Sequence, residues 1–103
     1  MNYHVLDPRF DPEQLGFIPS FLSEEDPRSA REQLDANYQH GGGWRPLDGW
    51  ELDTNTLGLT YPGDPELMPF AFTRLRGEII LFYPYAQVMI LQPDMTFEVA
   101  RMD

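Results

Sequence analysis

The sequence contains no cysteine and no lysine, only two histidines, and no long run of apolar residues. The lack of cysteine excludes a disulfide framework, a thiolate metal site and a cysteine nucleophile. No apolar stretch approaches the roughly 20 residues that cross a bilayer, so the sequence predicts no membrane-spanning segment. The first ten residues also lack the basic and then apolar order of a signal peptide, and we therefore expect a cytoplasmic protein.

Basic residues are scarce as well. Seven arginines stand against 17 aspartates and glutamates, which gives a formal net charge of −10. Nucleic acids and anionic membrane surfaces attract basic proteins, so we expect neither of them as a direct partner. An acidic surface suits a basic cleft on another protein, although net negative charge also keeps a small domain soluble. Because arginine pairs well with carboxylates, we expect some of these charges to be tied up internally.

The 103 residues make one domain, and its first third is irregular or helical. Residues 1–25 are predicted to form an irregular N-terminal arm with one short helical turn. The clearest helix is predicted over residues 26–39, because Asp26 can cap it and Pro27 can occupy its first position. Its apolar stripe consists of Ala30, Leu34 and Tyr38.

From residue 50 to residue 101 the pattern alternates between apolar and polar positions, which is typical of strands. A hairpin is predicted over residues 50–61. Further strands are predicted at residues 70–75, 78–83, 87–91 and 96–101, and the short loops between them require antiparallel neighbours. The predicted fold class is therefore α+β, an antiparallel β-meander of four to six strands with one main α-helix and the N-terminal arm.

The strand over residues 79–83 is apolar on both of its faces. Ile79, Leu81 and Tyr83 lie on one face, and Ile80 and Phe82 lie on the other. An antiparallel sheet with one wet face alternates apolar and polar residues, so this pattern predicts a sheet covered on both sides. One helix covers one side. The second cover is either the N-terminal arm or a second copy of the chain, and a homodimer is therefore one expected state.

The motif His40-Gly41-Gly42-Gly43 matches a string that forms part of the oxyanion hole in some lipases and esterases. Those enzymes also need a serine in a G-x-S-x-G elbow, and none of the three serines of this chain lies in that context. We therefore expect the motif to end the helix. No phosphate-binding loop, dinucleotide fingerprint or kinase motif is present, and we expect a protein that is not an enzyme and has no cofactor.

Two weak metal patterns are present. Residues 53–58 with Asp64 partly match a calcium loop, but Leu57 stands where an oxygen donor is needed, and the flanks read as strands. A hairpin turn explains the same residues. His4 and His40 lie in different segments, and no spacing shows whether the fold brings them together. We expect no metal site.

The residues that we expect to contact a protein partner are acidic or aromatic. Glu24, Glu25 and Asp26 lie at the predicted start of the helix, where its dipole favours anions. Trp44 and Tyr85 each lie next to a turn rich in glycine or proline, and exposed aromatic rings make good interface anchors.

Several turn-rich stretches resemble small uncharacterised proteins encoded by tailed phages and prophages. They are HGGGWRP (40–46), YPGDP (61–65), QPD (92–94) and FEVARMD (97–103). The resemblance covers about the last two-thirds of the chain and supplies no catalytic or binding residues. It implies expression in the cytoplasm of an infected bacterium and a role directed at the host, such as an anti-defence inhibitor.

Together these observations predict a non-enzymatic, acidic protein-binding module that acts on a basic protein surface. One alternative is a structural or assembly protein, such as a virion accessory protein, that oligomerises through its sheet. A second alternative is a small metal-assisted or acid–base enzyme, which requires His4, His40 and a carboxylate to lie together.

Overall fold

A computed structural model describes residues 3–6, 22–37, 43–45, 51–53, 55–60, 68–84 and 87–101 of the chain. Its elements are, in order, β1 (Tyr3–Val5), α2 (Ala30–Asn37), β2 (Glu51–Leu52), β3 (Leu59–Thr60), β4 (Ala71–Leu75), β5 (Glu78–Tyr83), β6 (Gln87–Leu91) and β7 (Phe97–Arg101). The predicted α+β class is confirmed. Among the described residues no helix is long and apolar enough to cross a membrane.

Five strands form one antiparallel sheet in the order β1-β4-β5-β6-β7. Strands β4 to β7 follow the chain, so the predicted meander is confirmed. Strand β1 was not predicted as a strand, because three residues are too few to show an alternating pattern. It pairs with the open edge of β4, with His4 opposite Phe72.

Two residues, Arg76 and Gly77, join β4 to β5. Their φ angles are +48° and +85°, which is the backbone of a type I′ turn and matches the twist of the two strands. A Cβ on Gly77 would meet Pro93 only at ordinary contact distance, so glycine is needed there for its backbone and not for space. The turn holds the Arg76 side chain at the end of the sheet.

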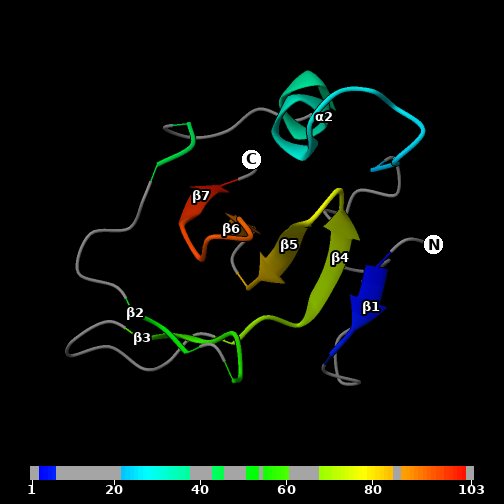
Figure 1. Cartoon of the computed structure of the whole chain (residues 1–103). Coiled ribbons are helices and arrows are strands. Elements are labelled where there is room, and N and C mark those ends of the chain that lie inside the picture. Colours follow the sequence, from blue (N-terminus) through cyan, green and yellow to red (C-terminus); the bar gives the residue numbers. More distant parts are fainter. Residues whose placement is uncertain are drawn as a thin grey trace.

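The two faces of the sheet carry separate apolar clusters, as the pattern of residues 79–83 predicts. On the helix face, α2 packs over the sheet, with Leu34, Ile80, Phe82, Val88 and Ile90 among the buried side chains. On the opposite face, the hairpin of β2 and β3 packs over a second cluster, which includes Leu59, Leu81, Tyr83, Met89 and Val99. Figure 1 shows α2 above the sheet and the hairpin below it.

Within the described part of the chain, the β2–β3 hairpin packs on this second face, which neither alternative drawn from the sequence included. Residues 7–21 of the N-terminal arm lie outside the described residues, and a second copy of the chain stays a prediction. Each hairpin strand has only two residues, so its apolar alternation is too short to indicate what it packs against.

The helix begins at Ala30 and not at residue 26. Asp26 does not cap it, because its carboxylate accepts the N–H of Arg28 and closes a separate turn. The cap is Ser29, whose Oγ accepts the N–H of Glu32 at 3.2 Å. Glu32 Oε1 in turn accepts the N–H and O–H of Ser29, which completes a capping box. The helix ends at Asn37, and the predicted end, residues 38–39, lies outside the described residues.

Candidate partner-binding site

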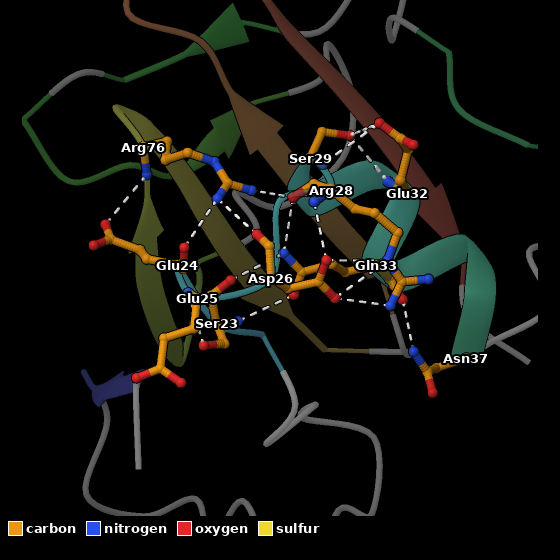
Figure 2. Close-up of polar contacts among 10 residues, drawn as sticks. All are labelled: Ser23, Glu24, Glu25, Asp26, Arg28, Ser29, Glu32, Gln33, Asn37 and Arg76. Carbon is orange, nitrogen blue, oxygen red and sulfur yellow. Dashed lines mark hydrogen bonds and ion pairs between the residues drawn. The ribbon is translucent and has the colours of Figure 1, made fainter.

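The predicted acidic residues lie on a turn of residues 23–28, called the acidic turn below, that leads into α2. Its inner side is held by Gln33, which is fully buried in the helix. Gln33 Oε1 accepts the N–H of Ser23 at 3.0 Å, and Nε2 donates to the carbonyls of Ser23 at 3.1 Å and Arg28 at 3.0 Å. One amide side chain thus fixes both ends of the turn (Figure 2).

Arg76 holds the same turn from the sheet side. Its backbone N–H donates to Glu24 Oε1 at 3.4 Å. Its guanidinium donates to the carbonyls of Glu24 at 3.2 Å and Asp26 at 2.8 Å, and also to the carbonyl of Arg28. Three carbonyls of one short turn therefore converge on one guanidinium, as Figure 2 shows. The acidic turn is fixed between α2 and the β4–β5 turn before any partner arrives.

Within the acidic turn, the three carboxylates have different environments. The carboxylate of Asp26 accepts hydrogen bonds from Nε and Nη2 of Arg28, at donor–acceptor distances from 2.8 to 3.2 Å. Hydrogen bonds from the Arg28 side chain and backbone hold the pKa of Asp26 below its ordinary value, and the same pair raises the pKa of Arg28. The negative charge of Asp26 is therefore largely compensated by its neighbour.

Glu24 and Glu25 present their carboxylates to solvent. Glu24 is oriented by the N–H of Arg76. The N–H of Glu25 donates to Ser23 Oγ at 3.1 Å, which fixes its backbone, and in Figure 2 its carboxylate points away from the polar network. These two side chains carry the outward charge of the acidic turn.

Trp44 is half-buried, so its predicted exposure is wrong. The ring packs against the cluster under α2, and its Nε1 donates to Asp35 Oδ1 at 2.8 Å. The guanidinium of Arg31 lies 5.6 Å from the ring centroid. A glycine-rich turn gives no sign of this packing, because the contacts are with a helix earlier in the chain.

Trp44 also lies at a different edge of the sheet from the acidic turn. The next residue, Arg45, forms a bridge with Val99 of β7, whereas the acidic turn contacts the β4–β5 turn. Strands β5 and β6 separate β4 from β7, a span of about 14 Å at ordinary strand spacing. Tyr85, the other predicted aromatic anchor, lies outside the described residues.

The calcium-loop match and the two histidines do not form a metal site among the described residues. The described part of the chain holds no group of three or more side chains suited to a metal ion. Asp53 Oδ1 accepts the N–H of Asn55, as the predicted hairpin turn requires. His4 is exposed on β1 and stacks on Phe72, with 4.9 Å between ring centroids. His40 and Asp64 lie outside the described residues.

The sequence alone does not reveal Gln33 and Arg76 as the residues that organise the site. Gln33 shares the buried side of the helix with Ala30 and Leu34, but a polar residue there resembles a solvated position. Arg76 is 52 residues from Glu24 in the chain, and no local pattern pairs them.

Comparisons of the chain with protein-family models, with curated proteins and with solved structures find no match.

Proposed function

We propose that the chain is a non-enzymatic protein-binding module whose acidic turn docks on a basic surface of another protein. One observation carries this proposal: Glu24 and Glu25 point outward from a turn that Gln33 and Arg76 already hold in place. A site that is ordered before binding loses less conformational entropy when the partner arrives.

The distribution of charge supports the proposal. Several described arginines are engaged within the chain: Arg28 with Asp26, Arg31 with Glu98 at 2.8 Å, and Arg76 with backbone carbonyls. Positive charge is thus used for internal contacts while the formal net charge stays at −10. Such a field speeds encounter with a basic partner and disfavours acidic ones. In the phage setting that the resemblance implies, the partner is a basic protein of the infected bacterium.

The test compares two variants that each remove one negative charge. Glu25→Gln changes the acidic turn, whereas Glu51→Gln changes an exposed carboxylate on the β2–β3 hairpin. The unaltered chain is used to retain partners from a bacterial lysate at low salt, and the affinity of each retained protein is then measured over a range of salt concentrations. We expect a basic protein whose affinity falls with salt and falls about two- to fivefold more in Glu25→Gln than in Glu51→Gln.

The proposal fails if no basic protein is retained, or if the affinity does not respond to salt. It also fails if the two variants weaken binding equally, because the effect then belongs to net charge and not to the acidic turn. Replacement of one exposed carboxylate leaves the fold intact, which the amide spectrum of each variant verifies.

A further inference from the structure

Strand β1 forms one outer edge of the five-stranded sheet, called the β1 edge below (Figure 1). The N–H of Leu6 donates to the carbonyl of Phe70, at the start of β4, at 2.7 Å. Because backbone groups alternate between the two sides of a strand, those of Tyr3 and Val5 point away from β4. In the described part of the chain, no other backbone pairs with them. Two N–H and two C=O groups are therefore available to another strand.

The opposite edge of the sheet, on β7, is closed at its centre. Val99 and Arg45 exchange two backbone hydrogen bonds there, at 2.9 and 3.1 Å. Sheet edges that remain open in soluble proteins commonly carry charged residues, proline or a bulge, which discourage pairing with another chain. The β1 edge has the sequence YHV and a regular register, and the exposed fractions of Val5 and Leu6 are 46% and 45%. It lacks these protections and suits an extended segment.

The acidic turn lies beyond the Tyr3 end of the β1 edge. Tyr3 lies opposite Thr73 on β4. Arg76, whose guanidinium and N–H bond to Glu24, follows Thr73 by three residues, which span about 10 Å at the ordinary rise of a strand. A strand antiparallel to β1 runs toward the acidic turn, so its C-terminal residues come within reach of Glu24 and Glu25.

We propose that the β1 edge accepts an extended segment of the basic partner as an additional antiparallel strand. Main-chain hydrogen bonds to Tyr3 and Val5 hold the segment, and its arginine or lysine residues, about three positions further on, contact Glu24 and Glu25. Each contact is weak alone, since the ladder is short and exposed charge pairs contribute little. Tight binding therefore requires a segment that is both extended and basic.

The inference rests on the proposed function for the charge of the partner, and on the β1 edge for its conformation. The two parts are separable, because one depends on backbone groups and the other on carboxylates. A second copy of the chain is a poorer occupant of the edge than a basic segment, because each copy carries a formal charge of −10.

The experiment is a titration of the full chain with the synthetic peptide acetyl-TVTVTGRR-amide, followed by the amide resonances in the NMR spectrum of the chain. We expect saturable shifts at residues 3–6 and at residues 24–25. The peptide acetyl-TVTVTGQQ-amide lacks both charges and should bind about two- to fivefold more weakly.

Two N-methylated forms of the arginine peptide test the main-chain contact. One form is methylated on both valines and the other on the second and third threonines, so the two forms block opposite sides of the strand but keep every side chain. Only one side can face β1. We expect one form to bind at least about tenfold more weakly and the other to keep its affinity within about twofold.

Two variants of the chain at one position complete the test. Val5→Pro removes the outward N–H and no bond to β4, because proline is tolerated on the open side of an edge strand. It should weaken binding of the arginine peptide at least about fivefold, whereas the control Val5→Thr keeps the N–H and should stay within about twofold. The amide resonances of β4 report whether β1 stays paired, and if it detaches in Val5→Pro, the N-methylated peptides on the unaltered chain decide.

The inference is overturned if the arginine peptide gives no saturable shifts at residues 3–6, or if the two N-methylated forms bind alike. It is also overturned if Val5→Pro, with β1 still paired, binds as well as Val5→Thr. Equal binding of the arginine and glutamine peptides has a different meaning: the acidic turn then contributes nothing, and the proposed function fails while the strand contact stands.

Discussion

At the scale of single residues, a buried amide contributes more to this molecule than its exposed ion pairs. The pairs of Arg28 with Asp26 and of Arg31 with Glu98 are partly open to solvent, where such pairs contribute about 0 to 1 kcal/mol each. Gln33 is 0% exposed and makes three hydrogen bonds to the backbone of the acidic turn. Removal of a buried partner leaves backbone groups unsatisfied, which costs more than the loss of an exposed charge pair.

Replacement of Gln33 by leucine should therefore destabilise the chain. Gln33→Leu keeps the volume and the helix propensity but removes the partners of Ser23 N–H and Ser23 C=O, so we expect a loss of about 1 to 3 kcal/mol in the free energy of unfolding. The control is Ala36→Leu on the exposed side of α2, which should change stability by less than about 0.5 kcal/mol. Urea denaturation measures both. Equal stability of the two variants would show that the turn does not depend on Gln33.

At the scale of elements, the β2–β3 hairpin is stable only because it packs on the sheet. Two-residue strands are not stable alone, so their order comes from packing on the second cluster. The Tyr83 hydroxyl donates to the carbonyl of Leu57 at 2.5 Å and fixes the hairpin loop to the centre of the sheet. Leu57 has a φ of +59°, an unfavourable angle for leucine that such contacts sustain. Burial also raises the pKa of Tyr83, so it stays a neutral donor.

Removal of this one hydroxyl should loosen the hairpin selectively. Tyr83→Phe keeps the ring and leaves the Leu57 carbonyl without this donor, and we expect a loss of about 1 kcal/mol in stability. Hydrogen exchange of the amides of Asp53 and Leu57 should become faster, because both are bonded within the hairpin loop. The amides of the β4–β5 turn provide the internal control and should keep their rates. Uniform acceleration across the chain would show global destabilisation instead of release of the hairpin.

These elements also show how far a sequence of this kind can be interpreted. The strands from residue 71 to residue 101 were predictable, because they are short runs rich in apolar and β-branched residues, joined by short turns that allow only antiparallel neighbours. The start of α2 was not predictable. Asp26 and Ser29 are equally good caps in isolation, and which of them caps the helix depends on the hydrogen bond between Asp26 and Arg28. For the candidate site, the sequence located Glu24 and Glu25, but the residue that fixes them is Arg76, about 50 positions away.

At the scale of the whole molecule, the architecture bears on the assembly alternative. A sheet with one bare apolar face would favour a second copy, but the hairpin covers that face with Leu59, which is 1% exposed. Phe72, Ile79 and Phe97 at the margin of the cluster are partly buried. A formal charge of −10 on each copy adds repulsion between copies at low salt. Both effects favour a monomer.

We therefore expect light scattering on a size-exclusion column to give a mass near 12.0 kDa. The mass should stay the same at low and at high salt, because the cover of the sheet is apolar and belongs to the same chain. A dimer present only at high salt would mean that charge repulsion, and not the hairpin, keeps the copies apart. A dimer at both salt concentrations would place a self-interface on the margin around Phe72, Ile79 and Phe97. Such a dimer would support the alternative function, an assembly protein that oligomerises through its sheet.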